Sequence, residues 1–124
     1  MEDVTVPVAA AWPLICATRE LSARRGVEIA NFGHLVDGNI HCTPIKPEAP
    51  SLDAWHDELQ ELLPELYQMV RDLGGTISGE HGIGRKRVKY LDIGLSTAER
   101  GTMLAVKRAL DPKGVLNPGV IFSE

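Results

Sequence analysis

One short segment constrains the fold of this chain more than any other, because it combines a tight turn with two histidines. Asp37 and Gly38 favour a two-residue β-hairpin turn, since the type I′ turn needs positive φ at both central positions. A turn here places three pairs opposite each other: Val36 and Asn39, Leu35 and Ile40, and His34 and His41. Opposed residues point to the same side of the ribbon, with Cβ atoms about 5 Å apart. The sequence therefore predicts two imidazoles on one face, which can bind one divalent metal ion.

The segments around this hairpin predict the fold class. Strands are expected at 4–6, 27–35, 39–45 and 76–78, and helices at 10–25 and 52–73. This is the order of the split βαβ unit, so we expect an α+β, ferredoxin-like antiparallel sheet with helices on one face. Pro64 predicts a kink in the second helix or its division into two. Ser96 and Glu99 predict a capping box for a last helix at 97–110. Residues 1–78 would form the ferredoxin-like part, and 79–124 an active-site loop and a helical tail.

Composition excludes several classes of function. The net charge of −4 argues against general nucleic-acid binding, which leaves a basic footprint. No apolar run approaches the roughly 20 residues of a membrane-spanning helix. The first residues lack the basic and apolar segments of a signal peptide, and two cysteines are too few for a disulfide framework. We therefore expect a cytoplasmic protein.

The two histidines are expected on the face of the hairpin that does not pack against the helices. That face also carries Phe32, Val36, Asn39 and Thr43, whereas the opposite face, with Gly33, Leu35, Ile40 and Cys42, resembles core. A mixture of polar and apolar groups is typical of a ligand site. Two structural histidines are the alternative, because the spacing of His34 and His41 alone has little specificity.

A glycine-rich loop, residues 79–84, contains the other candidate groups. Glu80 would complete a His2Glu set with an open position, which is the pattern of catalytic zinc sites. His81 would then be available as a general base, because the pKa of imidazole lies near neutrality. A flexible turn and a phosphate-binding loop are the alternatives, although the glycine spacing matches neither the Walker nor the Rossmann motif. The basic run at 85–89 indicates a solvated face, or an attraction for an anionic ligand.

Three ordered motifs resemble the C-terminal part of the FAD-linked oxidases. They are Gly33-His34-x-x-Asp37-Gly38-Asn39-x-His41, Ser78-Gly79-Glu80-His81-Gly82-Ile83-Gly84 and Asp111-Pro112-x4-Asn117-Pro118-Gly119, and the opening Glu2-Asp3-Val4-Thr5-Val6-Pro7 adds to them. The members that the chain resembles are the glycolate oxidase flavoprotein subunit, D-lactate dehydrogenase and D-2-hydroxyglutarate dehydrogenase. One departure is Val36, where the family usually has glycine.

The resemblance implies oxidation of a 2-hydroxy acid to a 2-oxo acid by hydride transfer to FAD. It also implies a divalent metal, with zinc as the expected ion, held by His34, His41 and Glu80. His81 would act as the catalytic base. The FAD-binding domain is absent from this sequence, so the isolated chain is expected to be inactive.

The resemblance also predicts contacts with the substrate, the cofactor and partner domains. We expect Thr43 and His34 to contact the substrate, and Asn117 to contact the cofactor. The expected partners are an FAD-binding domain or subunit and a small 2-hydroxy acid, and a homo-oligomer is a further possibility. Two other functions stay open: a stand-alone metal-binding or interaction domain without redox activity, and a metal-dependent hydrolase with the same His2Glu site.

Overall fold

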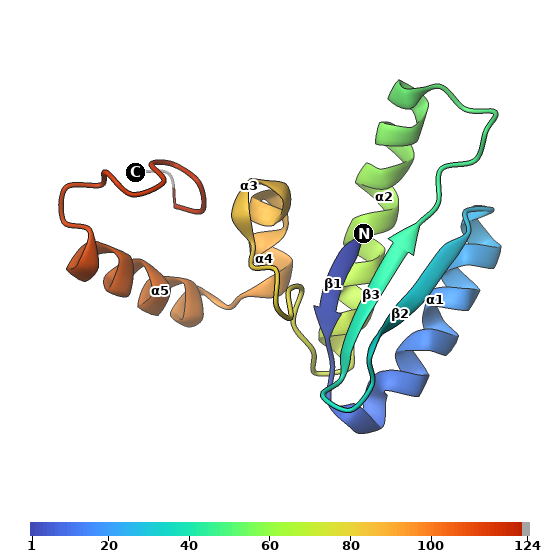
Figure 1. Cartoon of the computed structure of the whole chain (residues 1–124), viewed down its shortest axis with the longest axis horizontal. Helices are drawn as coiled ribbons and strands as arrows, with labels where there is room; N and C mark the ends of the chain where they lie inside the picture. The colour runs from blue at the N-terminus through green and yellow to red at the C-terminus, as the bar shows by residue number, and fades with distance from the viewer. Residues whose placement is uncertain (123–124) are drawn as a thin grey trace. The chain divides into compact units, whose positions relative to one another are not determined.

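The computed structural model describes residues 1–122, which form two compact units (Figure 1). The first unit comprises Met1–Gly82, and the second begins at Ile83. The first unit contains, in chain order, β1 (Glu2–Thr5), a 3-10 turn (Val8–Ala10), α1 (Ala11–Arg25), β2 (Ile29–His34), β3 (Asn39–Pro44) and α2 (Leu52–Asp72). The second contains α3 (Gly84–Arg87), a 3-10 turn (Val88–Tyr90), α4 (Leu91–Gly94) and α5 (Thr97–Leu110).

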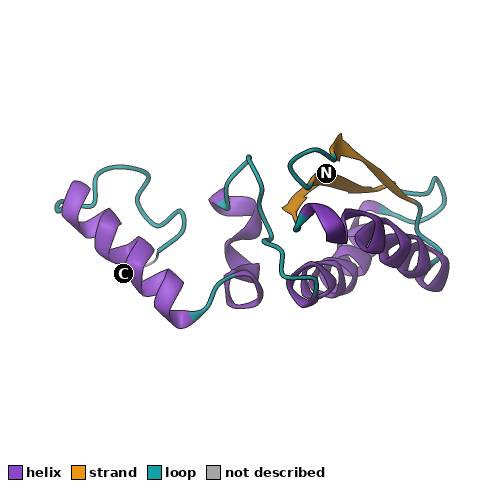
Figure 2. Cartoon of the chain, turned by 90° about the horizontal axis from the view of Figure 1, so that it is seen from below, coloured by secondary structure: helices purple, strands orange, loops and turns teal. Residues whose placement is uncertain are grey.

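The three strands form one antiparallel sheet in the order β1-β3-β2. Both α1 and α2 lie against the same face of this sheet (Figure 2). Within the first unit, the opposite face, called the open face below, carries the candidate site. The strand expected at 76–78 is reduced to a single bridge, in which Thr76 exchanges backbone hydrogen bonds with Thr5. A mixed α/β fold with a three-stranded antiparallel sheet is therefore confirmed, and within residues 1–122 the expected fourth strand amounts to this one bridge.

The core lies between the sheet and the two helices. Val4, Ile40 and Cys42 point from the sheet into this layer and are at most 2% exposed. The helices meet them with leucines at helical spacing, namely Leu14 and Leu21 of α1 and Leu62, Leu63 and Leu66 of α2. Each fully buried side chain of this size contributes about 1.5–3 kcal/mol. This layer fixes which strand residues face the helices and which face the open side.

Local signals in the sequence explain how these helices begin and end. Gly26 ends α1 in the left-handed conformation, with φ of 64°, as a glycine C-cap does. Ser51 begins α2 by accepting a hydrogen bond from the backbone N–H of Ala54. Pro64 lies inside α2, which continues as one helix, so the division of this segment into two helices does not occur.

Ion pairs hold α1 against α2. The guanidinium of Arg25 donates hydrogen bonds to Glu61 and Glu65, and Arg24 donates a further one to Glu65. Hydrogen bonds from Arg25 are the main reason why the pKa of Glu65 lies below its usual value. These contacts lie at the surface, so they supplement the leucine core rather than replace it.

The hairpin between β2 and β3 differs from its prediction. His34 pairs with Asn39 and Phe32 pairs with His41, so the pairing of His34 with His41 is wrong by two residues. Residues 35–38 form a four-residue turn, in which only Gly38 has positive φ. Val36 is therefore in the turn and 93% exposed, and Leu35, expected in the core, is 55% exposed.

A tertiary contact explains the wider turn. The carbonyl of Gly38 accepts a hydrogen bond of 3.0 Å from the N–H of Val6, and a Cβ at Gly38 would lie 1.9 Å from the Val6 oxygen. The Asp37 carboxylate accepts a hydrogen bond from the N–H of Asn39, which closes the turn through a side chain. The turn is thus shaped by the segment after β1 as well as by its own residues.

The second unit follows its sequence signals at both ends of α5. Ser96 and Glu99 form the predicted capping box, and the helix ends at Asp111, whose carboxylate accepts hydrogen bonds from the N–H groups of Val115 and Leu116. The short helices α3 and α4 were not predicted, and Arg87 is 4% exposed, so the expectation of a solvated face is wrong for this residue. In residues 1–122, no helix has the length and hydropathy needed to span a bilayer.

Candidate metal centre

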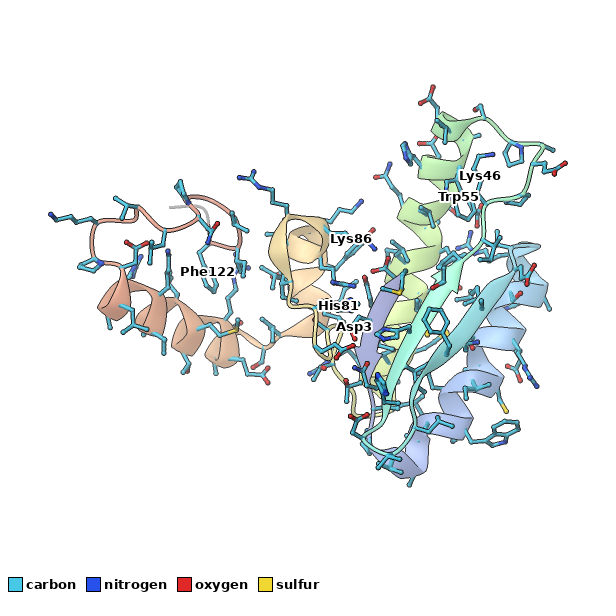
Figure 3. The ribbon with its side chains drawn as sticks, in the orientation of Figure 1. Asp3, Lys46, Trp55, His81, Lys86 and Phe122 are labelled. Carbon is cyan, nitrogen blue, oxygen red and sulfur yellow. The ribbon has the colours of Figure 1, made fainter. Side chains whose placement is uncertain are left out.

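The candidate site lies on the open face of the sheet in the first unit. Residues at odd positions of β1 and β3 point to this face, because side chains alternate along a strand. Asp3 comes from β1, His41 from β3 and His34 from the end of β2. The loop after Thr76 brings Glu80 and His81 to the same place, and Figure 3 shows His81 beside Asp3.

His34, His41 and Glu80 are brought together as predicted. Each offers one ligand atom, and these atoms lie within 4.8 Å of one another. The Nε2 atom of His41 is 3.4 Å from Oε1 of Glu80, and the His34 and His41 ring centroids are 6.4 Å apart. A separation of 3.4 Å is long for a charged hydrogen bond, and it suits two ligands about 2.1 Å from one tetrahedral ion. The three residues therefore fit a divalent metal in both donor chemistry and spacing.

The histidines come together although their predicted pairing is wrong. His34 is opposite Asn39, which is two residues before His41 on β3, so the two histidines are diagonal neighbours. A shift of two residues keeps every side chain on its original face, because the side-chain period of a strand is two. Diagonal neighbours are still within reach of long side chains. His34 is exposed, whereas His41 is 7% exposed.

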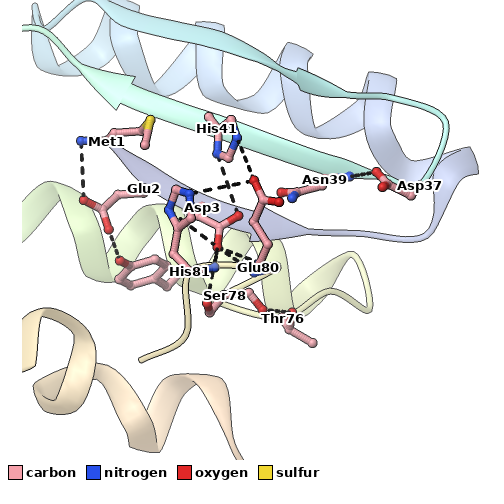
Figure 4. A network of polar contacts seen from close by, with 12 residues as sticks. Met1, Glu2, Asp3, Asp37, Asn39, His41, Thr76, Ser78, Glu80 and His81 are labelled. Carbon is pink, nitrogen blue, oxygen red and sulfur yellow. Dashed lines mark hydrogen bonds and ion pairs between the residues drawn. The ribbon is translucent and has the colours of Figure 1, made fainter. Parts of the chain in front are cut away.

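Asp3 organises the site, and sequence reasoning missed this role. Its side chain is fully buried, and its Oδ2 accepts hydrogen bonds from the N–H groups of Gly79, Glu80 and His81 and from the Ser78 hydroxyl (Figure 4). Burial raises the pKa of the Asp3 carboxyl, but these N–H donors and the nearby His81 imidazole outweigh burial, so the pKa is lowered. The available signal was a charged residue, Asp3, beside a β-rich run.

His81 lies directly against His41. Their rings are stacked, with centroids 5.2 Å apart and planes 9° from parallel. The His81 side chain is 38% exposed, and its Nε2 is 3.7 Å from Oε1 of Glu80. Asp3, His41 and His81 form a second group whose possible ligand atoms lie within 4.8 Å of one another. The two groups share His41, whose Nδ1 is 3.7 Å from Oδ1 of Asp3 and whose Nε2 is 3.4 Å from Oε1 of Glu80.

Gly79 lets the loop approach the sheet closely. A Cβ at this position would lie 2.3 Å from Oγ1 of Thr5 and 2.8 Å from Oδ1 of Asn39. Only glycine fits these distances without displacement, since carbon atoms in contact lie about 3.5–4.0 Å apart. Gly79 therefore allows Glu80 and His81 to lie where they do.

The remaining site predictions fall in two places. Thr43 lies on β3, on the same face as His41, and its buried hydroxyl has no hydrogen-bond partner within residues 1–122. Asn117 belongs to the second unit, where it has φ of 46° and its carbonyl accepts a hydrogen bond from the N–H of Val120.

Comparisons with known proteins show the family of this chain. A family model described as "FAD linked oxidases, C-terminal domain" matches residues 1–121. The chain is 33% identical to glycolate oxidase subunit GlcD of Bacillus subtilis over 126 aligned residues, which cover all of this chain and 26% of that protein. It is 40% identical to D-2-hydroxyglutarate dehydrogenase of Stutzerimonas stutzeri over 96 residues, covering 77% of this chain and 21% of that protein. D-lactate dehydrogenase of Anaerostipes hadrus is 32% identical over 119 residues, covering 96% of this chain and 25% of that protein.

The chain thus spans about a quarter of the length of these relatives. The match to the family covers almost the whole chain, including both units and every residue of the candidate metal centre. This chain belongs to the FAD-linked oxidase family and corresponds to its C-terminal domain.

Proposed function

We propose that this chain is the metal- and substrate-binding part of an FAD-dependent 2-hydroxy acid dehydrogenase. The observation that carries the proposal is the convergence of His34, His41 and Glu80 on one face of the sheet. The related proteins named above act on glycolate, D-lactate or D-2-hydroxyglutarate, and each of these compounds is a 2-hydroxy acid. The shared part of these compounds is a hydroxyl next to a carboxylate, which suits a metal centre with an open position.

Three residues would hold the ion, for which zinc is our proposal. His41 is the rigid member, because it is buried in the central strand, whereas His34 and Glu80 are exposed and can adjust. When bound, the ion would lower the pKa of the substrate hydroxyl, and FAD on a domain outside this chain would accept the hydride. This sheet, with the bridge at Thr76 in place of a fourth strand, would be a reduced ferredoxin-like unit.

His81 is proposed as the base that removes the hydroxyl proton. Its backbone is fixed by the hydrogen bond of 2.7 Å from its N–H to Asp3, and its ring is held by stacking on His41. Its imidazole is 38% exposed, so it can reach a substrate bound beside Glu80. Thr43 and His34 would orient the substrate, since both lie on the face that carries the metal ligands. Asn117 is proposed to contact the cofactor or its domain.

The metal centre can be tested with the purified chain. We expect one tightly bound zinc ion in the native chain, measured by elemental analysis and by competition with a coloured chelator. The variants H34Q, H41Q and E80Q should each lose this binding. H81Q should retain it, because His81 is not among the proposed ligands. The matched control is H56Q, because His56 is exposed on α2 and is the one remaining histidine of the sequence.

The redox role needs the FAD-binding domain. Co-expression of that domain with this chain should give a flavin-containing complex that oxidises a 2-hydroxy acid. H81Q should abolish turnover in the complex while the zinc remains bound. Equal zinc binding by the wild type, H34Q and E80Q would refute the metal centre. Zinc binding in a complex without 2-hydroxy acid oxidation would instead indicate a metal-binding domain without a redox role.

A further inference from the structure

We propose that Asp3 is a positioning residue that places the proton of His41 on Nδ1 and thereby leaves Nε2 as the metal-ligating atom. This inference rests on the proposed metal centre and assigns a role to a buried carboxylate outside the His34, His41 and Glu80 set. It also connects the loop and the strands, because Asp3 contacts both. The two oxygens of Asp3 have different neighbours.

The first oxygen of Asp3 is fully used by the loop. Oδ2 accepts hydrogen bonds of 3.0, 2.9 and 2.7 Å from the N–H groups of Gly79, Glu80 and His81, and one of 3.3 Å from the Ser78 hydroxyl. Three successive backbone donors converge on one atom, so the course of the loop is set around it. Through these bonds Oδ2 fixes the backbone from which the side chains of Glu80 and His81 project.

The second oxygen of Asp3 faces His41. Oδ1 is 3.7 Å from Nδ1 of His41, and in the described part of the chain both atoms are buried without a hydrogen-bond partner. An ionised carboxylate can only accept a hydrogen bond, so a bond between these two atoms requires the hydrogen on Nδ1. A buried polar atom is rarely left unpaired, and we expect this distance to shorten when an ion engages the other side of the ring.

The opposite edge of the same ring faces the proposed ion. Nε2 of His41 is 3.4 Å from Oε1 of Glu80. With the hydrogen on Nδ1, Nε2 keeps its lone pair and is available as a ligand. A carboxylate behind a ligating histidine also raises the basicity of that ligand, and such outer partners typically change metal affinity by about 10–100-fold. The geometry therefore assigns different tasks to the two nitrogens of His41.

The substitution D3N gives a test in which the expected tautomer reverses. Asparagine keeps the size and shape of Asp3, and its carbonyl can still accept hydrogen bonds from the loop. Its amide would then face Nδ1 of His41 as a donor, which requires Nδ1 without a hydrogen and places the hydrogen on Nε2. The matched control is D37N, because Asp37 lies in the same hairpin and its carboxylate accepts a backbone hydrogen bond that an asparagine can also accept.

The tautomer is read from long-range ¹H–¹⁵N correlation spectra of the ¹⁵N-labelled, metal-free chain, recorded over a pH series and taken where the ring nitrogen signals no longer change as pH rises. We expect the Nδ1–H form of His41 in the wild type and in D37N, and the Nε2–H form in D3N. Zinc affinity of D3N should fall by about 10–100-fold relative to D37N. These spectra require neither flavin nor turnover, so they separate this inference from the proposed function.

Two results would overturn the role of Asp3. An Nε2–H tautomer in the wild type would do so even if D3N failed to fold, and would favour the alternative donor group of Asp3, His41 and His81. An unchanged tautomer with unchanged zinc affinity in folded D3N would do the same. If instead the wild type shows the Nδ1–H form and binds no zinc, the proposed function fails while the role of Asp3 in orienting His41 holds.

Discussion

The substitution Gly79→Ala tests the idea that close contact with the sheet positions the loop that carries Glu80 and His81. The new Cβ would lie 2.3 Å from Oγ1 of Thr5 and 2.8 Å from Oδ1 of Asn39. To restore ordinary contact distances, either the Thr5 and Asn39 side chains must turn away from the new Cβ, or the loop and the strands must separate by roughly 1 Å. Overpacking of this kind costs about 1–3 kcal/mol of the free energy of unfolding. A shift of about 1 Å in a positioned group can reduce function by about 10²-fold, so zinc affinity should fall at least tenfold.

Urea unfolding followed by tryptophan fluorescence measures this loss of free energy of unfolding in the first unit, which contains Gly79. Trp12 and Trp55 both lie in the first unit, so the signal reports on residues 1–82. The control is Gly101→Ala, because a Cβ there meets no atom within 4 Å. We expect this control to leave the tryptophan transition and zinc affinity unchanged.

A double mutant sharpens the test. Thr5→Ala removes the oxygen that lies nearest to the new Cβ, so the combined variant with Gly79→Ala should be more stable than the sum of the single effects predicts. Strict additivity, or a Gly79→Ala variant with the stability and zinc affinity of the wild type, would refute the reasoning. In either case the position of Glu80 would not depend on this contact.

Three further predictions follow from other parts of the first unit. Gly38→Ala should cost about 1–3 kcal/mol more than Gly26→Ala in urea unfolding, because both glycines have positive φ but only the Gly38 Cβ would clash. The lowered pKa of Glu65 should stabilise the fold fully above its unfolded pKa of about 4.3, and this contribution should be lost as pH falls through the lower folded value. Glu65→Gln should therefore flatten that part of an acid unfolding curve. Burial and then the Glu2 carboxylate raise the pKa of Cys42 to about 12, so a thiol reagent should modify half-buried Cys16 first and Cys42 only after unfolding, as mass spectrometry would show.

The hairpin shows which part of the site could be predicted from sequence. Alternation along the strands placed Asn39, His41 and Thr43 on one face, and the structure confirms that assignment. The exact register could not be predicted, because Val6 binds the carbonyl of Gly38 and a contact across the unit decides the turn. His34 and His41 still share a face, because the error in register was an even number of residues.

Asp3 shows what local patterns miss. A single aspartate beside a β-rich run has no periodic partner, and its hydrogen-bond donors lie 75 to 78 residues away in the chain. The role of a loop glycine also depends on distant residues. Gly79 is needed because Thr5 of β1 lies too close to allow a Cβ. The segment 76–78, which was expected to be a strand, forms only one bridge. Whether such a short segment forms a strand depends on the residues packed beside it, which its own sequence does not reveal.

The hydrogen bonds between Asp3 and residues 78–81 have a consequence for the order of folding. They join the first strand of the unit to the segment that follows its last helix, so nearly the whole unit must be in place before they form. Contacts this far apart in sequence carry the largest loss of chain entropy and form after local structure. We therefore expect the arrangement of Glu80 and His81 beside His41 to be completed among the last steps of folding, so that partly folded chains lack it.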